Sequence, residues 1–163
     1  EYGTKAGKSV NFYAGVCELQ LGNYESAIKY LQAYNGKDAI LAARAQACIG
    51  DAYVGLEDYK KALSCFEQAA AEVDNMFAAG YLLKAGVVAE KLGQNEKAAS
   101  TLLEAAKRAD NTTLSPLFYL QAGQLFEALG NKDKALECYE TIKNDYPQSF
   151  QRNDIDKYIE RLK

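Results

Sequence analysis

The sequence predicts an all-α protein built as a solenoid of four helix hairpins and a C-terminal capping helix. Three observations lead to this prediction. Four segments of the chain align with one another at a nearly constant spacing, which is typical of helical repeat proteins. Each segment carries small or apolar residues three and four positions apart, as on one face of an α-helix. Only two prolines interrupt the 163 residues, so long helices are possible throughout.

The repeat is defined by small residues at matching positions of each copy. The first predicted helix of each copy contains an interior glycine, and these glycines lie 35, 36 and 37 residues apart: Gly15, Gly50, Gly86 and Gly123. The second predicted helix contains a matching alanine: Ala27, Ala62, Ala98 and Ala135. Between the two lies a corner of the type Leu-Gly-Asn, which suits a helix C-terminus followed by a turn. We expect the glycines and alanines to let the paired helices approach closely.

The hairpins are expected over four consecutive ranges: residues 5–36, 38–73, 75–110 and 115–146. Helix starts are predicted at Asp38, at Asp74 or Asn75, and at Ser115 followed by Pro116. A capping helix is expected over residues 150–162, with Ser149 as its N-cap after Pro147. The whole chain is predicted to be one array. Because the chain starts with Glu1, we expect it to be the C-terminal part of a longer protein.

Composition argues against several classes of function. The chain has no histidine, so Ser-His and Cys-His catalytic pairs and histidine-ligated zinc are excluded. The net charge of −3 offers no basic face for nucleic acid, and no glycine-rich loop suits a phosphate group. We therefore predict no enzymatic activity, no cofactor, no metal and no small-molecule substrate.

Four cysteines occur at apolar positions without a Cys-x-x-Cys pair: Cys17, Cys48, Cys65 and Cys138. A free cysteine in a helix behaves as a small apolar residue, and a disulfide needs Cα atoms within about 7 Å. We expect buried thiols rather than disulfide bonds.

These residues resemble the tetratricopeptide repeat. The second copy matches best, with Ile49-Gly50, Tyr53, Ala62 and Phe66 at the spacing of that motif. The resemblance covers nearly the whole chain. It implies a right-handed α-α superhelix that acts as a non-enzymatic scaffold for protein-protein interaction.

A finer resemblance concerns the joint before the capping helix. Tyr146-Pro147-Gln148-Ser149 is similar to a Tyr-Pro-x-Ser joint of bacterial cell-envelope members of the family. The chain as a whole is similar to proteins of Bacteroides-like bacteria that resemble the membrane-anchored ancillary subunit of the Sec translocon. This resemblance implies a location on the periplasmic side of the inner membrane, through an N-terminal anchor that is not part of this chain.

In such an array the first helices line the concave side. Twelve residues are expected on this side: Phe12, Val16, Leu19, Arg44, Asp51, Val54, Leu83, Val87, Glu90, Leu120, Gln124 and Glu127. The predicted function is to bind a peptide segment or a partner helix in this groove, within an envelope protein complex. The alternative is a structural module whose apolar surfaces form homo-oligomeric or intramolecular contacts.

Overall fold

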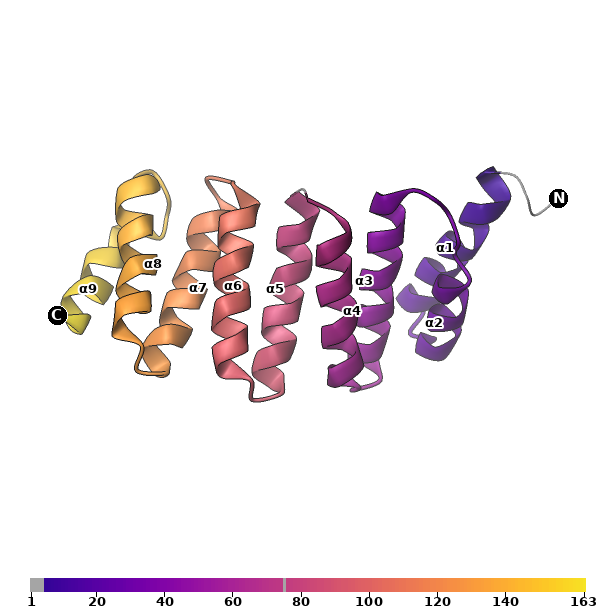
Figure 1. The fold of residues 1–163 in the computed structure, drawn as a ribbon, viewed down its shortest axis with the longest axis horizontal. Helices are drawn as coiled ribbons and strands as arrows, with labels where there is room; N and C mark the ends of the chain where they lie inside the picture. Colours follow the sequence, from indigo (N-terminus) through magenta and orange to yellow (C-terminus); the bar gives the residue numbers. More distant parts are fainter. Residues whose placement is uncertain (1–4, 75) are drawn as a thin grey trace. The chain divides into compact units, whose positions relative to one another are not determined.

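The structure, a computed structural model, describes residues 5–74 and 76–163. Within these ranges the chain forms nine α-helices and no strand (Figure 1). In chain order they are α1 (Lys5–Gln20), α2 (Tyr24–Gln32), α3 (Ala39–Gly55), α4 (Tyr59–Glu72), α5 (Met76–Lys91), α6 (Asn95–Ala109), α7 (Leu114–Ala128), α8 (Lys132–Asp145) and α9 (Arg152–Leu162). The prediction of an all-α fold with four hairpins and a ninth, capping helix is confirmed.

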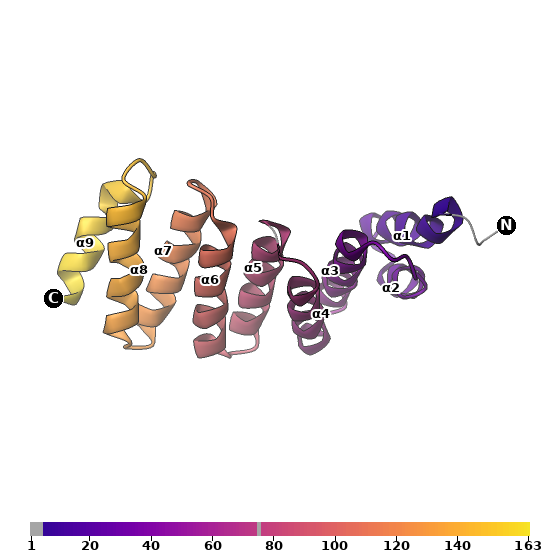
Figure 2. The same ribbon diagram turned by 45° about the horizontal axis from the view of Figure 1, so that its top comes forward.

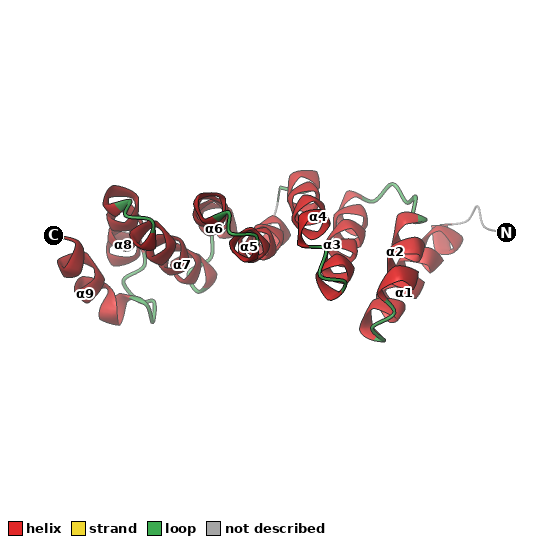
Figure 3. Cartoon of the chain, turned by 90° about the horizontal axis from the view of Figure 1, so that it is seen from below, coloured by secondary structure: helices red, strands yellow, loops and turns green. Residues whose placement is uncertain are grey.

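The chain divides into two compact units, Glu1–Asp74 and Asn75–Lys163. The first unit holds α1 to α4, and the second holds α5 to α9. In the second unit the helices of the α5–α6 and α7–α8 hairpins lie side by side and antiparallel (Figure 2). Seen along the helices, α5, α7 and α9 form one layer of this unit and α6 and α8 form the other (Figure 3).

Each hairpin closes where the glycine of its first helix meets the second helix. A Cβ atom at Gly15 would lie 2.5 Å from the Leu31 side chain, and one at Gly123 would lie 2.5 Å from the Tyr139 ring. The equivalent distances are 2.7 Å from Gly50 to Phe66 and 2.9 Å from Gly86 to Leu102. Distances below 3.0 Å force a shift of the neighbouring atoms. Only glycine fits these crossings without strain, and the four matching alanines are fully buried.

The corners between paired helices share one backbone geometry. Gly22, Gly93 and Gly130 have positive φ angles of 79°, 72° and 76°, and Glu57 takes the same place in the second hairpin with φ 59°. The following residue returns a hydrogen bond to the helix, as from the Asn23 N–H to the Glu18 carbonyl at 2.9 Å. This is a Schellman C-cap, in which the left-handed residue is normally glycine. Glu57 therefore occupies a left-handed C-cap position that the other three hairpins fill with glycine.

The predicted N-caps have mixed outcomes. Asp38 caps α3, since its carboxylate accepts the N–H groups of Ile40 and Leu41 at 2.9 and 3.0 Å. Ser115 does not cap α7, because the helix starts one residue earlier. There the side chain of Asn111 accepts the N–H groups of Thr113 and Leu114, both at 2.9 Å.

Two further helix starts were predicted. Ser149 does not cap α9, because that helix starts only at Arg152 and the Ser149 N–H bonds back to the Tyr146 carbonyl at 3.0 Å. The start predicted at Asp74 or Asn75 falls partly outside the described residues, since Asn75 is not among them.

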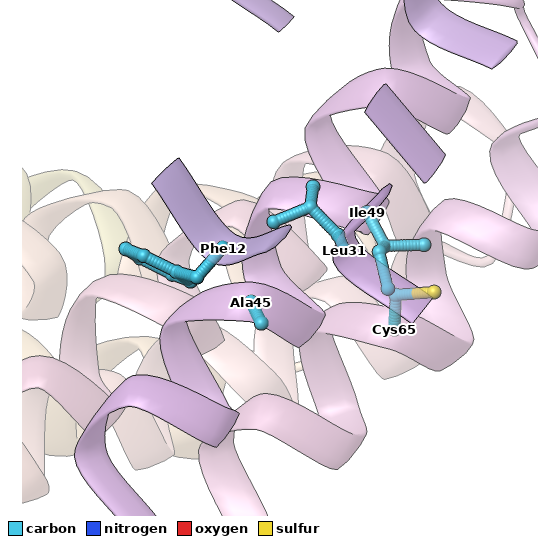
Figure 4. Packing of buried hydrophobic residues seen from close by; sticks show 5 residues of the cluster. All are labelled: Phe12, Leu31, Ala45, Ile49 and Cys65. Carbon is cyan, nitrogen blue, oxygen red and sulfur yellow. The ribbon is translucent and has the colours of Figure 1, made fainter. Parts of the chain in front are cut away.

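The core of the first unit is arranged around a short second helix. α2 has 9 residues, whereas the second helices α4, α6 and α8 have 14, 15 and 14. Beyond its end lies a cleft of about 350 Å³ over α3 and α4. A buried apolar cluster in this unit contains five side chains (Figure 4): Phe12, Leu31, Ala45, Ile49 and Cys65.

The capping helix α9 is amphipathic. Its apolar side is buried through Ile155, Ile159 and Leu162. Its polar side carries Asp156, which pairs with Lys143 at 2.7 Å and with Arg152 at 3.0 Å. One face therefore covers the apolar surface left by the last hairpin and the other meets water, as the end of a repeat array requires.

All four thiols are free, but they differ in burial. Cys65 and Cys138 are buried, Cys48 is half-buried and Cys17 is exposed. The prediction of a buried thiol is therefore wrong for Cys17, which lies two positions after Gly15 and so turns away from the face that Gly15 buries. Burial raises the pKa of the Cys138 thiol to about 12.

Candidate partner-binding surface

The candidate site is the first-helix surface, by which we mean the outward side of the first helix of each hairpin. In the first unit it lies on α1 and α3, and in the second unit on α5 and α7. Six of the twelve predicted residues belong to each unit.

In the first unit the predicted residues are mostly half-buried. Arg44 is exposed, and four others lie at intermediate depth: Val16, Leu19, Asp51 and Val54. Phe12 is different, because its side chain is only 2% exposed. The prediction that Phe12 lines the groove is thus corrected: its ring belongs to the core.

The environment of Phe12 explains the correction. Phe12 lies on the side of α1 that packs into the buried cluster of this unit, together with Leu31 of α2 and Ala45 of α3. Its ring meets Tyr34 edge-on at 5.8 Å, and the Arg44 guanidinium lies 5.9 Å above it. The neighbouring Tyr13 is 61% exposed and packs edge-on against Phe12 at 5.3 Å. Tyr13 was not predicted, and on α1 it presents an aromatic ring to solvent, as Tyr30 does on α2 at 40% exposure.

In the second unit the first-helix surface is apolar at one end. Val87 is 50% exposed and Leu83 is half-buried on α5, while Leu120 is half-buried on α7. Leu117 was not among the predicted residues, and it is 36% exposed one turn before Leu120. Its spacing of three residues from Leu120 was a usable signal, because residues three apart lie on the same helix face.

The other end of this surface is polar and is held by the capping helix. Glu127 accepts hydrogen bonds from Arg161 at 2.7 Å and from the Tyr139 hydroxyl at 2.9 Å. The hydrogen bond from Arg161 is the main reason that the pKa of Glu127 is lowered. Gln124 contacts the Tyr158 hydroxyl at 3.4 Å. Gln124 and Glu127, both predicted as groove residues, thus position α9. The remaining predicted residue of this unit, Glu90 on α5, is exposed.

The described residues show no arrangement typical of catalysis. No group of three or more His, Cys, Asp or Glu side chains in the described ranges could hold a metal ion. The lowered pKa values of Asp58 and Asp156 arise from hydrogen bonds with lysine or arginine, and their carboxylates belong to ion pairs at the surface. Across residues 5–74 and 76–163, no helix has the length and apolar character to cross a membrane. The first-helix surface combines exposed apolar side chains with charged ones, such as Arg44 and Glu90.

Hairpins closed at a glycine, with Schellman corners and a C-terminal capping helix, define an α-helical repeat protein. Two family models, both described as tetratricopeptide repeat, match residues 10–37 with 118–149, and residues 49–113. Together they cover more than half of the chain, which belongs to the tetratricopeptide repeat family. Members of this family are typically non-catalytic modules for protein-protein interaction.

Known proteins agree with this assignment. The chain is 28% identical over 112 residues to a TPR repeat-containing protein of Treponema pallidum (strain Nichols), a match over 68% of this chain and 46% of the relative. The chain thus spans about half the length of that relative. Among solved structures, MamA aligns with a TM-score of 0.65 at 16% identity, over 95% of this chain and 89% of MamA.

YrrB, described as a TPR protein with an unusual peptide-binding site, aligns with a TM-score of 0.60 at 22% identity, over 90% of this chain and 74% of YrrB. At these identities the two structural matches show the fold alone.

Proposed function

We propose that this chain is a non-enzymatic scaffold that binds a segment of another protein on its first-helix surface. The observation that carries the proposal is the exposure of large apolar or aromatic side chains on this surface: Tyr13 in the first unit, and Val87 and Leu117 in the second. Large exposed apolar patches often mark protein-protein interaction sites, and we take these side chains as candidates for such contacts in each unit. The peptide-binding site named for YrrB supports the same kind of ligand.

We further propose that the parent protein works in a protein complex of the bacterial cell envelope. The support is the joint at Tyr146-Pro147-Gln148-Ser149, which is similar to that of envelope members of the family. In this proposal the chain contacts its partners as a soluble module, and any membrane attachment comes from a segment outside it.

Site-specific photocrosslinking tests the binding proposal. A photoreactive amino acid replaces Val87 or Leu117 in the parent protein, and crosslinked products are collected from cells of its own host. Ser100 on α6 serves as the matched control, because it is exposed but lies on a second helix. Crosslinks to another protein from positions 87 and 117, and none from position 100, are expected.

Two results would count against the proposal. Crosslinks only between copies of the same chain would replace it with the structural, self-associating function. Equal crosslinking from the control and the test positions would show that the first-helix surface has no special role.

A further inference from the structure

The connection between α2 and α3 contains the sequence Asn35-Gly36, the only Asn-Gly pair in the chain (Figure 3). Neither residue belongs to a helix, and the Asn35 side chain is exposed to solvent. Within residues 5–74 and 76–163, neither the Asn35 side chain nor the Gly36 N–H takes part in a hydrogen bond. Both groups are therefore free to react with each other.

This pair meets the conditions for loss of the side-chain amide. Asparagine is chemically labile, because the backbone nitrogen of the next residue can attack its side-chain carbonyl carbon. A side chain on that next residue crowds the ring that forms, and glycine has no side chain. Within a helix the attacking N–H would be bound to a carbonyl group of the preceding turn, whereas the Gly36 N–H lies outside any helix. Asn35 is thus open to this reaction on both counts.

The reaction needs only base and water from the solvent. Base removes the proton of the Gly36 N–H, the nitrogen bonds to Cγ of Asn35, and the side-chain nitrogen leaves as ammonia, which gives a cyclic imide. Water then opens the imide at one of its two carbonyl carbons. Attack at Cγ breaks the new bond and gives aspartate, whereas attack at the main-chain carbon breaks the original peptide bond and gives isoaspartate. In both cases an amide and water become a carboxylic acid and ammonia.

The isoaspartyl product changes the backbone next to a packed ring. A Cβ atom placed on Gly36 would collide with the Tyr34 side chain, so the two residues lie in close contact. The Tyr34 ring meets the buried Phe12 ring edge-on at 5.8 Å and lines the cleft beyond the end of α2. In isoaspartate the chain runs through Cγ, which inserts an extra backbone atom between Tyr34 and Gly36. The fit of Gly36 against Tyr34 is then lost.

We propose that Asn35 deamidates spontaneously and that its isoaspartyl form releases the Tyr34 ring from Phe12, so that the α1–α2 hairpin opens more readily. This hairpin is sensitive to such a loss, because only Ala27 and Leu31 of α2 are buried. The proposal goes beyond the proposed function, since the modification requires no partner protein.

The first test measures where the chain deamidates. The full chain is incubated at mildly alkaline pH and digested, and the asparaginyl, aspartyl and isoaspartyl peptides are separated and identified by mass spectrometry. Asn23 and Asn131 are the matched controls, because both are exposed but have hydrogen-bonded side chains and are followed by residues larger than glycine. Asn35 is expected to be converted at least tenfold faster than either control, and Gly36→Ala is expected to slow its conversion.

Two results of this test would overturn the proposal. Conversion of Asn23 or Asn131 at the rate of Asn35 would show that the Asn-Gly pair has no special reactivity. An unchanged rate at Asn35 in Gly36→Ala would show that attack by the glycine nitrogen does not limit the reaction.

The second test measures the effect on the hairpin. The isoaspartyl form is purified from the incubated chain and compared by hydrogen exchange with the fresh chain and with Asn35→Asp, which adds the charge but keeps the backbone. The amides of α1 and α2 are expected to exchange faster in the isoaspartyl form alone, whereas those of α7 and α8 stay unchanged. Equal exchange of α1 and α2 in all three proteins would overturn the proposed opening. Equal acceleration in the isoaspartyl form and in Asn35→Asp would overturn the role of the backbone and assign the effect to charge.

Discussion

The corner at Glu57 allows a quantitative test of how the hairpins are closed. Glu57 has φ 59° at the place where the other three corners have glycine. The left-handed region costs an L-residue about 1 to 2 kcal/mol. Glycine avoids this cost but loses about 0.5 to 1 kcal/mol through greater freedom of the unfolded chain. The substitution Glu57→Gly is therefore expected to raise the free energy of unfolding by about 0.5 to 1 kcal/mol.

Urea denaturation followed by circular dichroism measures this gain. With an m-value of about 2 kcal/mol/M, the midpoint is expected to rise by about 0.3 to 0.5 M at unchanged m. Native-state hydrogen exchange locates the effect, which should be largest for amides of α3 and α4, because repeat proteins gain stability mainly in the altered repeat and its neighbours.

A matched control is the opposite change at an equivalent corner. Gly93→Ala places a side chain at φ 72° and is expected to lower the free energy of unfolding by about 1 kcal/mol. If Glu57→Gly lowered the urea midpoint while Gly93→Ala behaved as expected, the Glu57 side chain would stabilise the corner and the argument from backbone strain would be refuted.

Three further predictions concern packing, the capping helix and the thiols. Gly86→Leu is expected to lower the free energy of unfolding by about 1 to 3 kcal/mol, and with it the urea midpoint, because the Cβ alone would lie 2.9 Å from Leu102. The helical circular dichroism should be kept, and an unchanged midpoint would contradict the close helix crossing. The pKa of Glu127 is lowered in the folded chain, mainly by the hydrogen bond from Arg161, so the ionised carboxylate stabilises the folded chain above its ordinary pKa of 4.5. This stabilisation is lost as pH falls through the lower pKa of the folded chain. Hydrogen exchange of α9 between pH 6 and 3 should show the loss, and Glu127→Gln should make the exchange depend less on pH. Cys17 is expected to react fastest with a thiol reagent in the native state, and Cys17→Ser should remove this fast phase; an unchanged fast phase would assign it to another thiol.

The fold was predictable because its determinants recur. Small residues at the same places in four copies fix where paired helices cross, and a match in one copy supports the others. Helix starts were less predictable. Asp38 caps α3 as expected, whereas α7 starts at Leu114, so Ser115 lies inside the helix, and the Thr113 and Leu114 N–H groups bond to the Asn111 side chain.

The binding surface was less predictable, because exposure depends on the rotation of each helix about its axis. Phe12 and Tyr13 are adjacent in sequence, but Phe12 is enclosed by the Tyr34 ring and the Arg44 side chain, whereas Tyr13 is exposed.

The short helix α2 affects how the first unit resists unfolding. Only Ala27 and Leu31 of α2 are buried, whereas six residues of α4 are. In a chain of nearest-neighbour repeats, the hairpin with the smallest buried surface opens first, and its opening leaves the others in place. Under limited proteolysis, cleavage is therefore expected to begin in the connection between α2 and α3 and to remove the α1–α2 hairpin first. The opening rate of the α1–α2 hairpin would then determine how long the intact chain survives the protease.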